Sequence, residues 1–493
     1  MADNINLLSV LLLCTGLGFP LLFVLARYLT FVRMDGSLQS ALRYWIYFLY
    51  SLVGVRVLMG LFLIVTDIRF YAVAKFYPIR IAYPNYGLFR GLPYVLLCIG
   101  MIIYVKPIMD FIIGNRWKYF LLGVFSATFL LFFGAIHGGF VIGNAWMTIA
   151  PEHFADATLN STIYDVFATH ANRIAGIIKP AYRAAHTLSH PAGSLAYWHV
   201  MTHNTTPIIF AMLNVLLFSL AFPAMYWALN RRFDCLTTFQ SVIACLFIPA
   251  MLIYGRSDDA VYYSFAAIIA SLVSVAVNEK KYMLIPIAAC LFVVAINFSY
   301  ASIVLLPLIF SFIPETRLDQ IWQYVRRIIP HLLILIALIF VGMVLESSLT
   351  PYKWLDAFNA SAHRSNSGTF LFLILHGEYL RAISDRIMAI FDFLIFAGPL
   401  FLYIFICLIK SQRKPLGAWR IKSLALLIIL SVFSLYSLGP GELARPWGSL
   451  FLLIGFFWLP EFLAKESQER RWLLIKMQVA WALALQVFIN FSL

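Results

Sequence analysis

The sequence has little charge. Only 12% of its 493 residues are charged, whereas 62% are hydrophobic. An ordinary soluble domain is about half apolar and about a quarter charged. The scarcity of charge therefore excludes an ordinary soluble protein. It indicates a polytopic membrane protein, in which apolar runs of about 20 residues cross the bilayer as helices.

Other absences exclude further classes of protein. The 6 cysteines are scattered without a CxxC pair, so no disulfide framework is expected and the cysteines read as inert core residues. No GxGxxG, Walker or HExxH motif occurs, so soluble nucleotide chemistry is unsupported. The net charge of +14 lies in short loops rather than in one basic tract, which excludes a nucleic-acid partner.

The apolar runs predict an all-α membrane helix bundle of about 14 transmembrane helices, with 12–14 as the range. The segment 281–314 fits either one kinked pass or two. The acidic N-terminus and its long first run favour an uncleaved membrane helix over a signal peptide. The expected spans are 6–32, 45–66, 93–113, 117–137, 206–229, 236–255, 261–278, 281–297, 299–314, 328–346, 388–410, 418–437, 446–463 and 470–492.

Alternate loops after residue 206 are basic, which places them in the cytoplasm and the intervening loops outside. The basic loops are 230–234, 278–281, 317–327, 410–422 and 465–471. This pattern divides the chain into N-terminal transmembrane helices (1–137), an external loop (138–205) and a C-terminal bundle (206–493) with its own external loop, 347–387. Loop 67–92 should be external but is basic, which a re-entrant or interfacial segment would explain.

The external loop 138–205 carries apolar residues at helical spacing with polar residues between them. This pattern predicts amphipathic helices that lie on the membrane surface. The apolar residues are Ile163, Val166, Phe167, Ile174, Ile177 and Ile178.

Charged and histidine side chains near membrane depth are expensive and usually functional. Asp165 in "YDVFATH" reads either as a solvated charge or as a functional carboxylate. His186 and His190 in "AHTLSHPAG" are four residues apart, so on a helix they could bind one metal, although a third ligand is lacking. Pro191 and Gly193 place His190 at a turn. Further histidines in the same loop are His153, His170, His199 and His203.

Two more external stretches hold paired charges. Asp258 and Asp259 in "GRSDDAVYY" begin a helix, where the helix dipole favours acids, and Arg256 precedes them. Glu442 and Arg445 in "GPGELARPW" are three apart and fit either a structural ion pair or a phosphate-binding arginine.

These motifs, in this order, resemble a bacterial group within the GT-C superfamily of membrane glycosyltransferases. Its members carry H-x-x-x-H-P-P-G, an acidic pair before an aromatic-rich helix, a small-residue helix ending in F-S, and G-E-x-x-R-x-W. This chain has "HTLSHPAG", "SDDAVYYSF", "AACLFVVAINFS" and "GELARPW", between about 160 and 450, with Ala192 in place of the second proline.

The resemblance implies an enzyme that transfers a sugar from a polyprenyl-phosphate donor, usually with inversion at the anomeric carbon. Asp165 would be the general base, with Asp156 and Asp67 as alternatives. Arg256 or Arg445 would hold the leaving phosphate. The remaining candidates would bind or orient substrate: His186, His190, Asp258, Asp259 and Glu442.

The resemblance also sets the expected partners and location. The acceptor is a lipid, glycan or protein, and the enzyme sits in a bacterial inner membrane among membrane lipids, with its site facing the periplasm. No cofactor or metal site is expected with certainty, because members differ in their need for a divalent metal. A lipid or glycan transporter or flippase is the alternative, although no inverted repeat is visible. A non-catalytic subunit of a membrane complex is the other.

Overall fold

A computed structural model describes the chain in separate ranges, and the account below is confined to them. They are 43–49, 51, 79–81, 100, 103–136, 156–182, 187–188, 190–255, 257–300, 302–303, 306, 318–365, 370–379, 382–383, 393–411 and 448–491. The expected spans 6–32 and 418–437 lie outside them.

The described chain is helical, as the composition predicts. Within these ranges, three helical stretches are long and apolar enough to cross a membrane: Pro207–Leu229, Asp258–Glu279 and Val325–Leu349. Shorter apolar helices cover Lys118–Leu131, Cys235–Leu246, Leu284–Phe298 and Gly448–Ala464. The fold therefore agrees with a membrane protein, and the count of about 14 spans stays a prediction.

The expected span 236–255 is interrupted, and proline is the reason. Helix α14 (Cys235–Leu246) ends before Ile248, which is extended, and α15 (Pro249–Tyr254) begins at Pro249. A residue before proline is disfavoured in the helical region. The span 206–229 is likewise built from two helices, α12 (Pro207–Ser219) and α13 (Ala221–Leu229).

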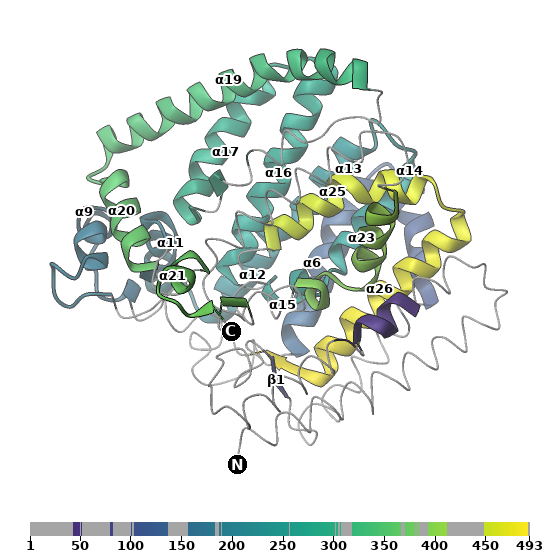
Figure 1. Ribbon diagram of the computed structural model, residues 1–493, viewed down its shortest axis with the longest axis horizontal. Helices are drawn as coiled ribbons and strands as arrows, with labels where there is room; N and C mark the ends of the chain where they lie inside the picture. The colour runs from purple at the N-terminus through teal and green to yellow at the C-terminus, as the bar shows by residue number, and fades with distance from the viewer. Residues whose placement is uncertain are drawn as a thin grey trace.

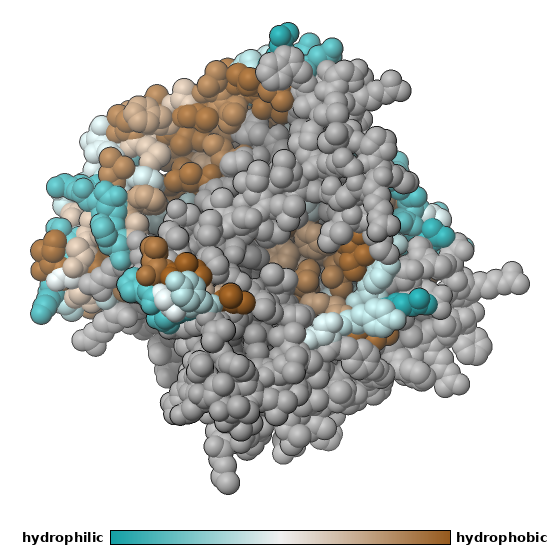
Figure 2. Space-filling view, in the orientation of Figure 1, coloured by the Kyte–Doolittle hydropathy of each residue, from teal (hydrophilic) through white to brown (hydrophobic). Residues whose placement is uncertain are grey.

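Three neighbouring helices run side by side through the molecule (Figure 1): α16 (Asp258–Glu279), α17 (Leu284–Phe298) and α19 (Leu318–Leu349). α16 and α17 are joined by a short turn at residues 280–283, so they run in opposite directions. From Ile329 to Leu349, α19 exposes large apolar side chains, which Figure 2 shows as a brown surface. This surface suits contact with lipid.

Five further helices belong to the bundle. They are α6 (Lys118–Ile136), α21 (Phe370–Leu375), α23 (Pro399–Ser411), α25 (Gly448–Ala464) and α26 (Gln468–Phe488). The exception to the helical fold is one antiparallel pairing of β1 (Ile79–Ile81) with β2 (Ile489–Phe491). In both strands the sequence alternates apolar and polar residues.

Several basic loops meet at one end of the bundle. This agrees with the expectation that basic loops lie on one side of the membrane. Arg231 forms an ion pair with Glu279, which joins loop 230–234 to loop 278–281. Arg471 donates from Nη1 to Thr237 Oγ1, which brings loop 465–471 to the start of α14.

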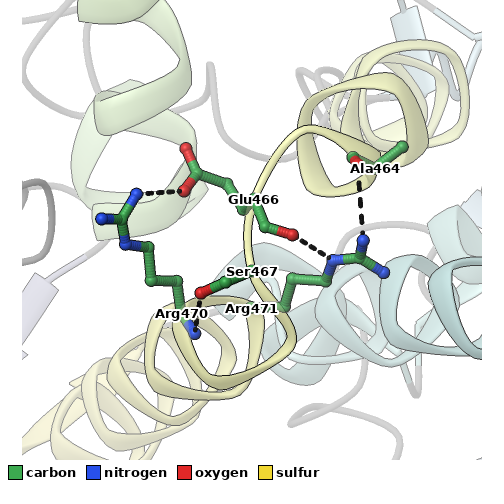
Figure 3. A network of polar contacts seen from close by, with 5 residues as sticks. All are labelled: Ala464, Glu466, Ser467, Arg470 and Arg471. Atoms are coloured by element: carbon green, nitrogen blue, oxygen red, sulfur yellow. Dashed lines mark hydrogen bonds and ion pairs between the residues drawn. The ribbon is translucent and has the colours of Figure 1, made fainter.

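The 465–471 loop is also braced internally (Figure 3). Arg470 pairs with Glu466 at 3.4 Å, and Arg471 donates to the carbonyls of Glu466 (2.9 Å) and Ala464 (3.4 Å).

This arrangement predicts which loops share a side of the membrane. We expect Lys281→Cys and Glu469→Cys, in a chain whose native cysteines are replaced by alanine, to react with a membrane-impermeant maleimide from the same side. Asn204→Cys and Lys353→Cys should react only from the other side. Labelling of all four from one side would contradict the arrangement.

The segment that the loop charges predict to be external forms helices that pack on one another. α9 (Ile163–Ile174) contacts α11 (Ala192–Asn204) and α20 (Trp354–Ser365), and all three gather at one end of α16, α17 and α19 (Figure 1). Val166 and Ile174 are buried in this contact, whereas Ile163 and Ile177 are exposed. Of the apolar residues expected to face the membrane surface, some are thus buried between helices and others are exposed.

Candidate functional site

The HPAG turn is bonded to two distant parts of the chain. His190 donates from Nδ1 to the carbonyl of Phe298 at 3.1 Å, at the last residue of α17. The backbone N–H of Ala192 donates to the hydroxyl of Tyr352 at 3.3 Å, just beyond α19. Burial raises the pKa of Tyr352 to about 12, so its hydroxyl stays protonated at neutral pH. The turn therefore connects α11 to the ends of α17 and α19.

The glycine of the turn is required by close packing. A Cβ built on Gly193 would lie 2.6 Å from the carbonyl oxygen of Asn297 and 2.7 Å from its Cβ. Pro191 is extended and occupies the N-cap position of α11 without a side-chain cap, and Ala192 is fully buried. Any side chain at Gly193 would push α11 away from the end of α17.

His170 is hydrogen-bonded to the backbone of the HPAG turn. Its Nε2–H donates to the carbonyl of His190 at 3.0 Å, and Tyr182 donates its hydroxyl to Nδ1 at 3.3 Å. Burial lowers the pKa of His170 to about 4. The ring is therefore neutral at physiological pH, and one fixed tautomer satisfies both partners.

Helix α11 carries Trp198 to the acidic pair of α16. The indole Nε1 of Trp198 donates to Asp258 Oδ2 at 2.9 Å. Asp258 is only 3% exposed and Asp259 7%, and Asp259 also accepts from the Ser257 hydroxyl at 3.3 Å. The helix dipole favours both carboxylates at this N-terminus. Two buried acids therefore lie where α11 meets α16.

Asp165 takes part in the N-terminal cap of α9. Its carboxylate accepts from the hydroxyl of Ser161 and from the backbone N–H of Thr162 (3.1 Å), while its own N–H donates to Thr162 Oγ1 (3.1 Å). The hydrogen bonds from Ser161 and Thr162 hold the pKa of Asp165 below its usual range. The reciprocal pattern is a capping box.

Several of the other candidate residues lie outside the part of the chain that the structure describes. His186, Arg256, Glu442 and Arg445 lie outside the described ranges, as does Asp67. Of the alternatives for the base, Asp156 is described and is buried. Gly448 and Ser449, directly after "GELARPW", pack on Tyr263 and bond to Tyr262 of α16, respectively.

The histidines do not gather around a metal in the part of the chain that is described. His199 donates from Nδ1 to the carbonyl of Ala157 (3.1 Å), and His203 bonds to the carbonyl of His199 (2.7 Å). Within the same ranges, no group of three or more His, Cys, Asp or Glu side chains is placed to hold a metal ion.

Sequence reasoning missed three residues at this junction: Asn297, Glu346 and Tyr352. Glu346 in the last turn of α19 accepts from Asn297 Nδ2 at 2.8 Å. An acid that ends a long apolar run was a visible signal, since such residues are costly at membrane depth. Tyr352 carried no comparable signal, because its partner Ala192 lies 160 residues earlier.

The junction therefore combines buried carboxylates, neutral histidine and tyrosine hydroxyls at one end of an apolar bundle. Such groups can accept hydrogen bonds from hydroxyls and orient a polar head next to an apolar surface. Comparison of the chain with family models, with curated proteins and with solved structures gives no match.

Proposed function

We propose that the chain is a GT-C-type membrane glycosyltransferase that moves a sugar from a polyprenyl-phosphate donor to an acceptor at the external face. One observation carries the proposal. Three motifs of the resemblance, which are far apart in sequence, meet at one end of the bundle. His190 bonds to the carbonyl of Phe298 in the F-S motif, and Trp198 bonds to Asp258 of the acidic pair.

The proposed chemistry assigns a role to each group. A base removes the proton of the acceptor hydroxyl while its oxygen attacks the anomeric carbon, and polyprenyl phosphate leaves with the bonding electrons. Arg256 or Arg445 stabilises the leaving phosphate. Asp258, Asp259 and Glu442 orient sugar hydroxyls or hold the arginines. His186 and His190 bind the phosphate or orient the acceptor.

Asp165 remains our first candidate for the base, with Asp156 and Asp67 as alternatives. Its hydrogen bonds to Ser161 and Thr162 favour a structural role as the cap of α9. They lower the pKa of Asp165, and a carboxylate with a lowered pKa is a weaker proton acceptor. The proposal includes a bacterial inner membrane, a site that faces the periplasm, and a lipid, glycan or protein acceptor.

The chain offers a matched pair of variants to separate the two roles of Asp165. Thr162→Ala removes the cap to the Asp165 N–H but keeps the carboxylate, whereas Asp165→Asn keeps the shape and removes the base. If Asp165 is the base, Asp165→Asn should lose about 100-fold or more in transfer rate. Thr162→Ala should lose only stability, by about 0.5–2 kcal/mol.

Transfer would be measured with purified protein in detergent, across polyprenyl-phosphate-linked sugars. If Asp165→Asn and Thr162→Ala transfer sugar at the same rate, Asp165 serves only as a cap. Asp156 and Asp67 would then be the candidates for the general base. A wild-type chain that transfers no sugar from any donor would favour the transporter or the non-catalytic subunit.

A further inference from the structure

Glu346 places a carboxylate near the end of an apolar span. It lies in the last turn of α19, inside the stretch Val325–Leu349, and is half-buried. Its Oε2 accepts a hydrogen bond from Asn297 Nδ2 at 2.8 Å. Carboxylates within a membrane span are costly in free energy, and they usually mark a functional site.

The partner, Asn297, is buried and incompletely bonded. It is 8% exposed, and its Nδ2 donates both to Glu346 and to the carbonyl of Val293 (3.1 Å). Among the described residues, its Oδ1 has no hydrogen-bond partner. Buried polar atoms in native proteins are nearly always satisfied by protein, water or ligand, so this oxygen calls for a donor.

The pair borders the HPAG turn. The backbone and Cβ of Asn297 are the atoms against which Gly193 packs. The neighbouring Phe298 carbonyl accepts from His190, and Tyr352, six residues after Glu346, accepts from Ala192. The Glu346–Asn297 pair therefore lies at the junction where the proposed substrate is handled.

We propose that Glu346 and Asn297 form a subsite that accepts hydrogen bonds from the sugar hydroxyls of the lipid-linked donor. The Asn297 Oδ1 and the carboxylate of Glu346 are acceptors, and hydroxyl groups supply the donors that match them. A carboxylate repels phosphate, so the subsite fits the sugar and not the phosphate of the donor. This inference rests on the proposed function and names which part of the substrate these residues bind.

Binding to the full-length protein in detergent tests the subsite without requiring transfer. The probes are undecaprenyl phosphate and its glucose, mannose and galactose derivatives, with affinity taken from the ligand-induced shift in thermal unfolding. We expect the wild type to bind at least one sugar derivative about tenfold more tightly than undecaprenyl phosphate. Glu346→Leu and Asn297→Leu should abolish this preference, because a hydrogen bond to a charged group is typically worth about tenfold or more.

Two further variants separate binding from bracing of α17 against α19. Glu346→Gln keeps an acceptor oxygen and should keep part of the preference, even if Glu346→Leu folds poorly. Asp356→Asn, an exposed acid on the neighbouring α20, should keep all of it. A folded Glu346→Leu that retains the full preference would overturn the subsite, as would a wild type that binds all probes equally.

Transfer measured on the same preparations keeps the two proposals apart. A wild type that transfers sugar, with KM unchanged in Glu346→Leu, leaves the transferase standing and removes the subsite. If the wild type transfers no sugar but prefers the sugar derivatives, and Glu346→Leu abolishes that preference, the transferase is ruled out and the subsite is supported.

Discussion

Replacing Gly193 by alanine is expected to destabilise the protein, although alanine is the better helix former. The added Cβ would meet the carbonyl oxygen of Asn297 at 2.6 Å, and a backbone atom cannot move aside as the end of a flexible side chain can. Overpacking of this kind costs about 1–3 kcal/mol, more than the roughly 1 kcal/mol that alanine gains over glycine in a helix.

The matched control is Gly123→Ala in α6. The nearest atom to a Cβ there is Pro223 Cγ at 3.9 Å, an ordinary contact. Thermal unfolding in detergent should therefore show a lower midpoint for Gly193→Ala and an unchanged or higher midpoint for Gly123→Ala. Equal midpoints would mean that α11 does not dock on the end of α17 as described.

Asp258→Ala is expected to cost about 1.5–3 kcal/mol of unfolding free energy, because it removes the charged acceptor of the Trp198 indole. Asp258→Asn should cost less, since the amide oxygen can still accept. If Asp258 also orients a sugar hydroxyl, as proposed, both variants should raise the KM for the donor.

A double-mutant cycle isolates this bond. Trp198→Phe removes the indole N–H, so Asp258→Ala should have a smaller effect when it is combined with that substitution, with a coupling energy of at least about 1 kcal/mol. Asp259→Asn, next to Asp258 but bonded to Ser257, serves as the control and should not couple to Trp198. Additive effects of Trp198→Phe and Asp258→Ala would rule out the bond as a stabilising contact.

Composition and loop charge by themselves determined the class of protein and which loops share an end. An apolar chain can satisfy its backbone in a membrane only through internal hydrogen bonds, which requires helices here. The alternation of basic loops placed 230–234, 278–281 and 465–471 together, and the contacts of Arg231 and Arg471 agree.

Tertiary structure alone decided what the HPAG turn contacts. The sequence shows a turn and a histidine pair, of which His186 lies outside the described residues. The structure adds that His190 donates to a carbonyl 108 residues away and that Gly193 packs against Asn297. It also brings forward Glu346, whose partner lies 49 residues earlier. The physical reason is that local pattern specifies helices and turns, whereas contacts between distant segments depend on how whole helices pack.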